Sequence, residues 1–209
     1  MLDKAVRVLG ALEDGPRSLA GLVAETGITR ATAHRLATAL EAHGLVRRDG
    51  DGRFALGLRL VALGRAAASA LPLGEAARPA LEALRDVTGE SVQLYVRDGD
   101  RRVCIASLES PHGLRTIVPL GASLPLDRGS AGRVLGGDID AARRGWAESV
   151  GEREAGVASV SAPVRTPAGA LVAAVSVSGP IERTSRAPGR RYADAVVAAA
   201  RRIELAAGG

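Results

Sequence analysis

Hydroxyl and basic side chains gather in one short stretch near the N-terminus. Thr29, Arg30, Thr32, His34 and Arg35 stand at the start of a helical pattern, which places them on the exposed side of a helix. Such donors and acceptors bind base edges and phosphates when a helix enters the major groove. A solvated helix face is the alternative, because charge pattern alone permits it. The flanking elements must decide between the two.

A second group of basic residues follows directly. Arg47, Arg48 and Arg53 flank the segment from Asp49 to Gly52, whose glycines accept positive φ and therefore predict a tight hairpin. Arginines on a hairpin can contact the phosphate backbone or the minor groove. The aspartates at the tip repel phosphate, so we expect the hairpin to flank the DNA rather than insert deeply.

Three predicted helices precede this hairpin. Apolar residues at helical spacing predict them over about 2–12, 19–26 and 30–43, with Ser18 and Thr29 as N-caps. The second and third are separated by Gly27, Ile28 and Thr29, which is the spacing of a helix-turn-helix. A hairpin with strands 45–48 and 53–56 then completes a winged helix. This context favours DNA binding over a solvated face.

The rest of the chain predicts a linker helix and a second domain. We expect a winged helix-turn-helix over 1–57, a linker helix over 58–72 that Pro72 and Gly74 end, and a domain over 73–209. The overall class is α+β, because the second domain alternates short apolar segments with turns between two terminal helices. Strands of its antiparallel sheet are predicted over 91–97, 102–108, 114–118, 158–164 and 171–177.

Serine hydroxyls alternate with apolar residues in the last two of these strands. Ser159 and Ser161 share one face of their strand, as do Ser176 and Ser178, because side chains alternate with a period of two. Such a face meets water or lines a ligand pocket, and periodicity leaves both readings open. The glycine-rich turn 128–132 offers backbone N–H groups that could receive a carboxylate.

Composition excludes several classes of protein. The chain has 209 residues, 46% hydrophobic and 24% charged, which is typical of a globular protein. It has no apolar run long enough to span a bilayer and no signal-peptide pattern, so we expect a cytoplasmic protein without a membrane partner. A formal charge of +5 permits nucleic-acid binding, and 2% aromatic residues are too few to stack single strands. Double-stranded DNA is the better partner.

Reactive side chains are few. Cys104 is the single cysteine, so one chain has no internal disulfide and no cysteine-built metal site. We expect it to be buried among apolar residues. His34, His43 and His112 lie in separate predicted elements without metal-ligand spacing, and His112 is expected to be exposed. The sequence therefore predicts no enzyme, no metal and no cofactor.

Several motifs together resemble the IclR-type transcriptional regulators. In the N-terminal half they are residues 2–5, 18–27, 29–36 and 52–57. In the C-terminal half they include Ser130-Ala131-Gly132, Ala162-Pro163-Val164 and residues 175–181. The resemblance implies a homodimer or dimer of dimers that reads an inverted-repeat operator in double-stranded DNA. It also implies a GAF-like second domain that binds a small-molecule effector.

The resemblance also implies an effector site. Family members bind small carboxylates, and matching motif by motif places the pocket at Ser130, Ala131, Val157, Ser159, Ser176 and Ser178. Ser159 replaces the family's usual cysteine, so the ligand cannot be copied from the family. The segment between Leu135 and Trp146 is shorter than usual, which implies a reduced lid.

A branch of the family is suggested by residues 86–95 and 146–165. They look like an actinobacterial branch associated with leucine and other amino-acid biosynthesis genes, which implies an amino acid or a pathway intermediate as effector. The rival hypothesis is a ligand-sensing or protein-interaction module whose winged helix does not read DNA specifically. Sequence-specific DNA binding distinguishes the two.

Overall fold

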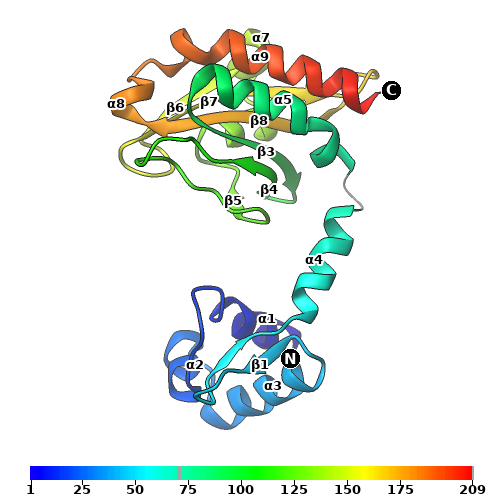
Figure 1. Cartoon of the computed structure of the whole chain (residues 1–209), viewed down its shortest axis with the longest axis vertical. Coiled ribbons are helices and arrows are strands. Elements are labelled where there is room, and N and C mark those ends of the chain that lie inside the picture. The colour runs from blue at the N-terminus through cyan, green and yellow to red at the C-terminus, as the bar shows by residue number, and fades with distance from the viewer. Residues whose placement is uncertain (70–71, 209) are drawn as a thin grey trace. The chain divides into compact units, whose positions relative to one another are not determined.

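The computed structural model describes residues 1–69 and 72–208, and the chain divides into two compact units (Figure 1). The N-terminal unit is Met1–Ala70, and the C-terminal unit is Leu71–Gly209. Each has its own hydrophobic core. The predicted class, a helix-turn-helix domain followed by an α+β domain with an antiparallel sheet, is confirmed.

The N-terminal unit packs its helices around one small core. Its elements are α1 (Leu2–Gly10), α2 (Leu19–Thr26), α3 (Arg30–Ala42), β1 (Val46–Arg48), β2 (Phe54–Leu56) and α4 (Arg59–Ser69). Val8 of α1, Leu22 of α2 and Leu36 of α3 meet Phe54 of the hairpin in that core. Burial of this apolar stripe holds the three helices together, since helices of this length are marginal alone.

Local chemistry sets the turn between α2 and α3. The Ser18 hydroxyl caps α2 by accepting a hydrogen bond from the Gly21 N–H at 3.2 Å. Gly27 ends α2 at φ +63°, and Ile28 is buried in the angle between the helices. Thr29 precedes α3, but its side chain makes no cap and donates to the Thr32 hydroxyl at 3.0 Å. Thr29 therefore occupies the predicted N-cap position, but without a side-chain capping hydrogen bond.

The hairpin is fixed at both ends by backbone contacts. Antiparallel β1 and β2 pair Val46 with Leu56 and Arg48 with Phe54. Phe54 also exchanges two backbone hydrogen bonds of 2.8 Å with Arg17. Where the chain leaves the hairpin, the Gly57 N–H donates to the Leu45 carbonyl at 2.9 Å, so closely that a Cβ on Gly57 would clash with backbone.

A six-stranded antiparallel sheet forms the centre of the C-terminal unit, in the order β5-β4-β3-β8-β7-β6. Its strands are β3 (Ser91–Asp98), β4 (Arg101–Leu108), β5 (Ser123–Pro125), β6 (Ala147–Val150), β7 (Val157–Arg165) and β8 (Leu171–Pro180). The helices are α5 (Pro72–Thr88), α6 (Ser130–Gly136), α7 (Ile139–Arg144), α8 (Ile181–Thr184) and α9 (Pro188–Ala207).

Helices cover both faces of this sheet. The long α5 and α9 lie side by side on one face (Figure 1), where Leu81 and Val196 pack against Val160 and Val175. On the other face, Ala131 of α6 belongs to a second cluster with sheet residues that include Tyr95, Cys104 and Ala174. The sheet is therefore the middle layer of three.

Two predicted features are corrected. Residues 114–118 form no strand, because Leu114 and Ile117 point to solvent, and the third strand of that half is β5 instead. Pro72 and Gly74 do not end a helix; they lie in the first turn of α5, where proline costs no hydrogen bond. The predicted linker helix, 58–72, also includes residues 70 and 71, which lie outside the described residues.

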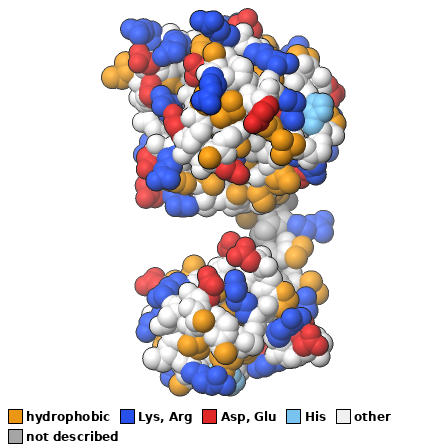
Figure 2. Space-filling model, turned by 90° about the vertical axis from the view of Figure 1, so that its left-hand side faces the viewer, with side chains coloured by type: hydrophobic (Ala, Val, Ile, Leu, Met, Phe, Trp, Pro, Cys, Tyr) orange, Lys and Arg blue, Asp and Glu red, His pale blue; other side chains and the backbone are white. Residues whose placement is uncertain are grey.

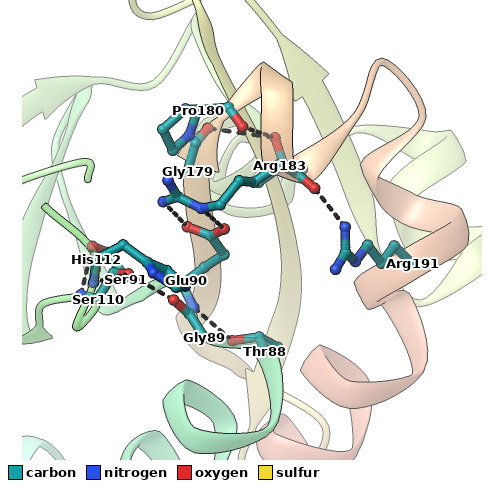
Figure 3. A network of polar contacts seen from close by, with 11 residues as sticks. Thr88, Gly89, Glu90, Ser91, Ser110, His112, Gly179, Pro180, Arg183 and Arg191 are labelled. Carbon is teal, nitrogen blue, oxygen red and sulfur yellow. Dashed lines mark hydrogen bonds and ion pairs between the residues drawn. The ribbon is translucent and has the colours of Figure 1, made fainter. Parts of the chain in front are cut away.

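A buried ion pair closes one end of the sheet (Figure 3). Glu90, 2% exposed before β3, accepts hydrogen bonds from both Nε and Nη2 of Arg183 in α8, at 2.7 and 2.8 Å. These hydrogen bonds raise the pKa of Arg183. Gly179 leaves room for the carboxylate, since a Cβ there would collide with it. The pair ties the α5–β3 turn to α8.

We predict that Gly57→Ala destabilises the N-terminal unit by about 1–3 kcal/mol, because its Cβ must displace backbone atoms of Gly44 and Leu45. Gly50→Ala is the matched control, since no atom lies within 4 Å of the Cβ position there. Thermal unfolding of both variants checks this. Equal melting temperatures would mean that the hairpin exit relaxes without cost.

Candidate nucleic-acid interface and ligand cavity

The exposed side of α3 carries the predicted DNA-binding residues. Its apolar side, including Ala33 and Leu36, is buried in the core of the N-terminal unit. The opposite side leaves Arg30, His34 and Arg35 exposed. In Figure 2, basic side chains line the lower margin of this unit. The helix-turn-helix therefore holds α3 so that its cationic, hydrogen-bonding side stays exposed to solvent.

The arginines of the hairpin differ in how far acids neutralise them. Arg53 forms ion pairs with Asp49 at 2.8 Å and with Asp51 at 3.1 Å. Arg48 lies 3.4 Å from a Glu41 oxygen and 4.3 Å from the Phe54 ring centroid. Within the described ranges, Arg47 has no ion pair. Arg30 and Arg35 on α3 likewise have none within those ranges.

The acid at the hairpin tip is turned inward. The Asp49 carboxylate accepts hydrogen bonds from the Asp51 N–H at 3.0 Å and the Arg53 N–H at 2.8 Å. Desolvation opposes ionisation, but these hydrogen bonds and the Arg53 guanidinium outweigh it and lower the pKa of Asp49. The hairpin thus satisfies its own negative charge, and the expected repulsion of phosphate by Asp49 is reduced.

A small cavity of about 20 Å³ lies between α6 and the sheet of the C-terminal unit. This is the room that one water molecule needs. The cavity is lined by Gln93, Tyr95, Arg102, Gly129, Ser130, Ala131, Ser149, Arg153, Val157, Ser159, Ser176 and Ser178. The six residues that the sequence placed in one pocket are therefore all brought together here.

Serine hydroxyls form a chain beside the cavity. The Ser130 hydroxyl at the start of α6 lies 2.7 Å from that of Ser159 and 2.7 Å from that of Ser161. Ser159 continues the chain to Ser149 of β6 at 3.1 Å. The serines of β7 thus meet α6 rather than water, which excludes a fully solvated face.

The lining of the cavity also carries charged and aromatic side chains that the sequence pattern did not indicate. Arg102 is 2% exposed, donates to the carbonyls of Pro125 and Arg128, and lies 5.4 Å from the Tyr95 ring centroid. Desolvation lowers the pKa of Arg102, although an arginine keeps its charge. The same burial raises the pKa of Tyr95.

One missed residue left a signal in the sequence. Gln93 pairs with Ser176 across β3 and β8, and its side chain is completely buried. A glutamine amid apolar strand residues, with polar Ser91 two positions earlier, marks the hydroxyl-bearing face. Arg102 left no such signal, because its burial depends on the distant segment 125–128.

Reactive groups outside the cavity offer little chemistry. Cys104 is buried as expected, and burial raises its pKa to about 12. Within 1–69 and 72–208, no three His, Cys, Asp or Glu side chains are placed to hold a metal ion. Over the same ranges, no helix has both the length and the apolar character needed to cross a membrane.

Family models match both units. The IclR helix-turn-helix domain matches residues 1–50, and the bacterial transcriptional regulator IclR C-terminal domain matches 65–143 and 137–205. The chain belongs to the IclR family. Relatives in this family are transcriptional regulators rather than enzymes. IclR-family regulators bind DNA and respond to ligands, and this chain is one of them.

Individual relatives agree with this assignment. A glycerol operon regulatory protein of Streptomyces griseus is 29% identical over 87% of this chain and 85% of its own length. The transcriptional repressor IclR of Escherichia coli is 25% identical over 95% of this chain and 86% of its own length. The regulator KipR of Bacillus subtilis is 31% identical, but only over 56% of this chain and 47% of its own.

Solved structures share the IclR fold. A protein from Rhodococcus sp. RHA1, assigned as a transcriptional regulator, superposes with a TM-score of 0.79 at 26% identity, covering 98% of this chain and 96% of that one. An IclR homologue from Microbacterium hydrocarbonoxydans, solved with 4-hydroxybenzoate, has a TM-score of 0.82 at 22% identity. The match covers 99% of this chain and 98% of that one. The latter likeness shows the fold alone.

We predict that Arg47→Ala weakens binding to duplex DNA more than Arg53→Ala, because Asp49 and Asp51 already neutralise Arg53. Loss of one phosphate contact should lower the salt slope of the affinity by about 1. Fluorescence anisotropy over a salt series measures the DNA affinity of both variants and its salt slope. An equal loss for the two would show that the ion pairs of Arg53 open on DNA.

Proposed function

We propose that this chain is a homodimeric regulator that reads an inverted-repeat operator and responds to a small carboxylate. The observation that carries the proposal is a free cationic face on the second helix of a helix-turn-helix, in one chain with a polar, arginine-lined cavity. Such a regulator acts in the cytoplasm, on double-stranded DNA. The proposed domains are 1–57, a linker helix 58–72 and a GAF-like effector domain 73–209.

Residues of α3 and the hairpin would contact the operator. Arg30, Thr32, His34 and Arg35, with Thr29 before them, would read base edges or hold phosphates. Arg47 would bind the backbone beside them. Arg48 and Arg53 contribute less in this proposal, because acids of the same unit already pair with them.

The effector would occupy the cavity beside α6. Hydroxyls of Ser159, Ser176 and Ser178, together with Ser130, Ala131 and Val157, would surround it. The 4-hydroxybenzoate in the Microbacterium structure is a carboxylate held by a protein of this fold, which supports an anionic effector. Buried Arg102 supports the same class, since a buried guanidinium favours an anion.

A second copy of the chain would pair through the N-terminal unit. Exposed apolar side chains stand at α1 and at α4: Met1, Leu2, Val6, Leu58, Val61 and Leu63. An apolar surface of this kind is typical of an interface rather than of a solvated face. A symmetric dimer would present two copies of α3, as an inverted repeat requires.

Amino-acid biosynthesis, with leucine as its end product, is the pathway we propose. It rests on the resemblance of residues 86–95 and 146–165 to an actinobacterial branch. The Streptomyces relatives named for the glycerol operon make carbon catabolism the rival pathway. A protein-interaction module is the rival function, and the free arginines of α3 favour DNA over it.

Selection of bound fragments from sheared source-genome DNA, at physiological salt and with or without leucine, tests the proposed function. We expect enrichment of a palindromic site near amino-acid genes. Enrichment near glycerol genes would replace the pathway and keep the function. Salt-sensitive binding without any enriched sequence would favour the interaction module, because phosphate contacts alone give affinity without specificity.

The proposed dimer leads to a separate prediction. Val61→Asp should convert the protein toward monomer and lower operator affinity at least about tenfold, because a charge then enters an apolar interface. Val87→Asp, at an exposed valine of α5, is the control. Sedimentation velocity measures the mass of each. A dimeric Val61→Asp protein would place the interface elsewhere.

A further inference from the structure

A second hollow of the C-terminal unit lies apart from the ligand cavity. It is an open groove of about 940 Å³ beside α6 and α7, and its lining comes from within the ranges 97–100, 125–127 and 132–140. It shares no lining residue with the cavity between α6 and the sheet. We call it the α6–α7 groove. Its volume far exceeds that of a water molecule or an ion, so its occupant must be larger.

Relatives in the IclR family carry additional residues at this place. The C-terminal family model matches this chain in two pieces that overlap at 137–143, where the groove meets α7. The matches to the Streptomyces griseus and Escherichia coli regulators run over 216 and 235 aligned positions, although this chain has 209 residues. The extra residues of those relatives therefore belong between α6 and α7. The open groove is a surface particular to this chain.

Free carboxylates dominate the charge of the groove. Asp100 and Asp127 are exposed, and neither has an ion pair within the described ranges. Asp138 uses one oxygen to cap α7, accepting from a backbone N–H at 2.9 Å, which leaves the other oxygen available. The two arginines of the lining already donate to protein acceptors. The groove therefore attracts a cationic occupant.

Apolar side chains accompany these acids. Ile139 at the start of α7 is 83% exposed, and half-buried Leu126 lines the same groove. Exposed apolar surface with a charged rim is typical of a protein contact. A small hydrated cation would leave Ile139 in water, whereas a polypeptide surface that is both apolar and basic would cover it.

The C-terminal end of α9 carries the complementary pattern. Leu205 is 80% exposed. Arg201 and Arg202 precede it by four and three positions, so the three side chains are neighbours on one side of the helix. Both arginines are exposed, and neither has an ion pair among the residues that the structure describes. We call these three residues the α9 tip.

The groove and the α9 tip lie at the same end of the central sheet. Strand register places the β3–β4 turn, which lines the groove, beside the β7–β8 turn. The end of α9 is held at the latter, where Glu204 accepts from the Arg165 N–H at 2.7 Å. The helices α6 and α9 cover opposite faces of the sheet. A two-fold axis across this end, in the plane of the sheet, exchanges the faces and brings each tip opposite the other copy's groove.

We propose that a second copy of this chain fills the α6–α7 groove, with the α9 tip of each copy in the groove of the other. Leu205 packs against Ile139, and Arg201 and Arg202 approach the carboxylates, Asp127 among them. Both grooves are filled at once, as a closed two-fold contact requires. The contact is separate from the pairing through α1 and α4, so it doubles whatever mass that pairing gives.

Sedimentation velocity of the full-length protein at low salt tests the contact. One helix end in one groove is a small interface, so we expect a dissociation constant of about 10–100 µM. The mass should therefore double across a series from about 1 to 200 µM, and salt should weaken the association. A constant mass over the whole series would overturn the inference.

A charge exchange assigns the contact to residues. Asp127→Arg and Arg201→Asp should each weaken the association at least about tenfold, because like charges then face one another. The two changes in one chain should restore most of it. Glu182→Arg and Arg190→Asp are the matched controls, since both side chains are exposed and lie outside the groove and the tip. They should leave the association unchanged.

The outcome of the exchange decides the pairing. Single variants that associate as the unaltered protein does, or a double variant that stays as weak as the singles, would overturn it. At about 1 µM, below the expected range, the mass reports the α1 and α4 pairing alone, and Val61→Asp is tested there. Operator selection tests the proposed function without reference to the groove. Failure of either therefore leaves the other standing.

Discussion

The alternation of side chains along β7 and β8 governs the C-terminal unit. Val160 and Val175 face the core beneath α5 and α9, while Ser161 and Ser176 face α6. A shift of one residue in register would turn the hydroxyls into the hydrocarbon core beneath α5 and α9 and the valines toward α6. One pairing therefore determines both the stability of the sheet and the polarity of the cavity beside it.

The role of each arginine in this chain depends on the groups that surround it. Arg183 neutralises a buried carboxylate, and Arg53 neutralises the acids of its own hairpin. Arg102 is held by backbone carbonyls, so its charge remains uncompensated by any ion pair within the described ranges. Net charge therefore says little about ligands, because only arginines without an acidic partner are available to bind one.

Sequence patterns predicted the N-terminal unit well because its signals are local. Gly27, Ile28 and the glycines of the hairpin act within a few residues of themselves. The C-terminal sheet depends on pairing between distant strands, which periodicity does not specify. Apolar Leu114 and Ile117 therefore mimicked a strand, and nothing local marked Arg102, which segment 125–128 buries.

The six residues predicted for the ligand cavity lay together because they share strand faces or follow one glycine turn. Its volume of about 20 Å³ has an energetic consequence. A ligand larger than water would need a wider form of this cavity, and its apparent dissociation constant equals the intrinsic one divided by the fraction of molecules in that form. A wide form populated at about 1% weakens binding about a hundredfold. Tight packing around α6 therefore raises the concentration that any ligand of this cavity needs in order to bind.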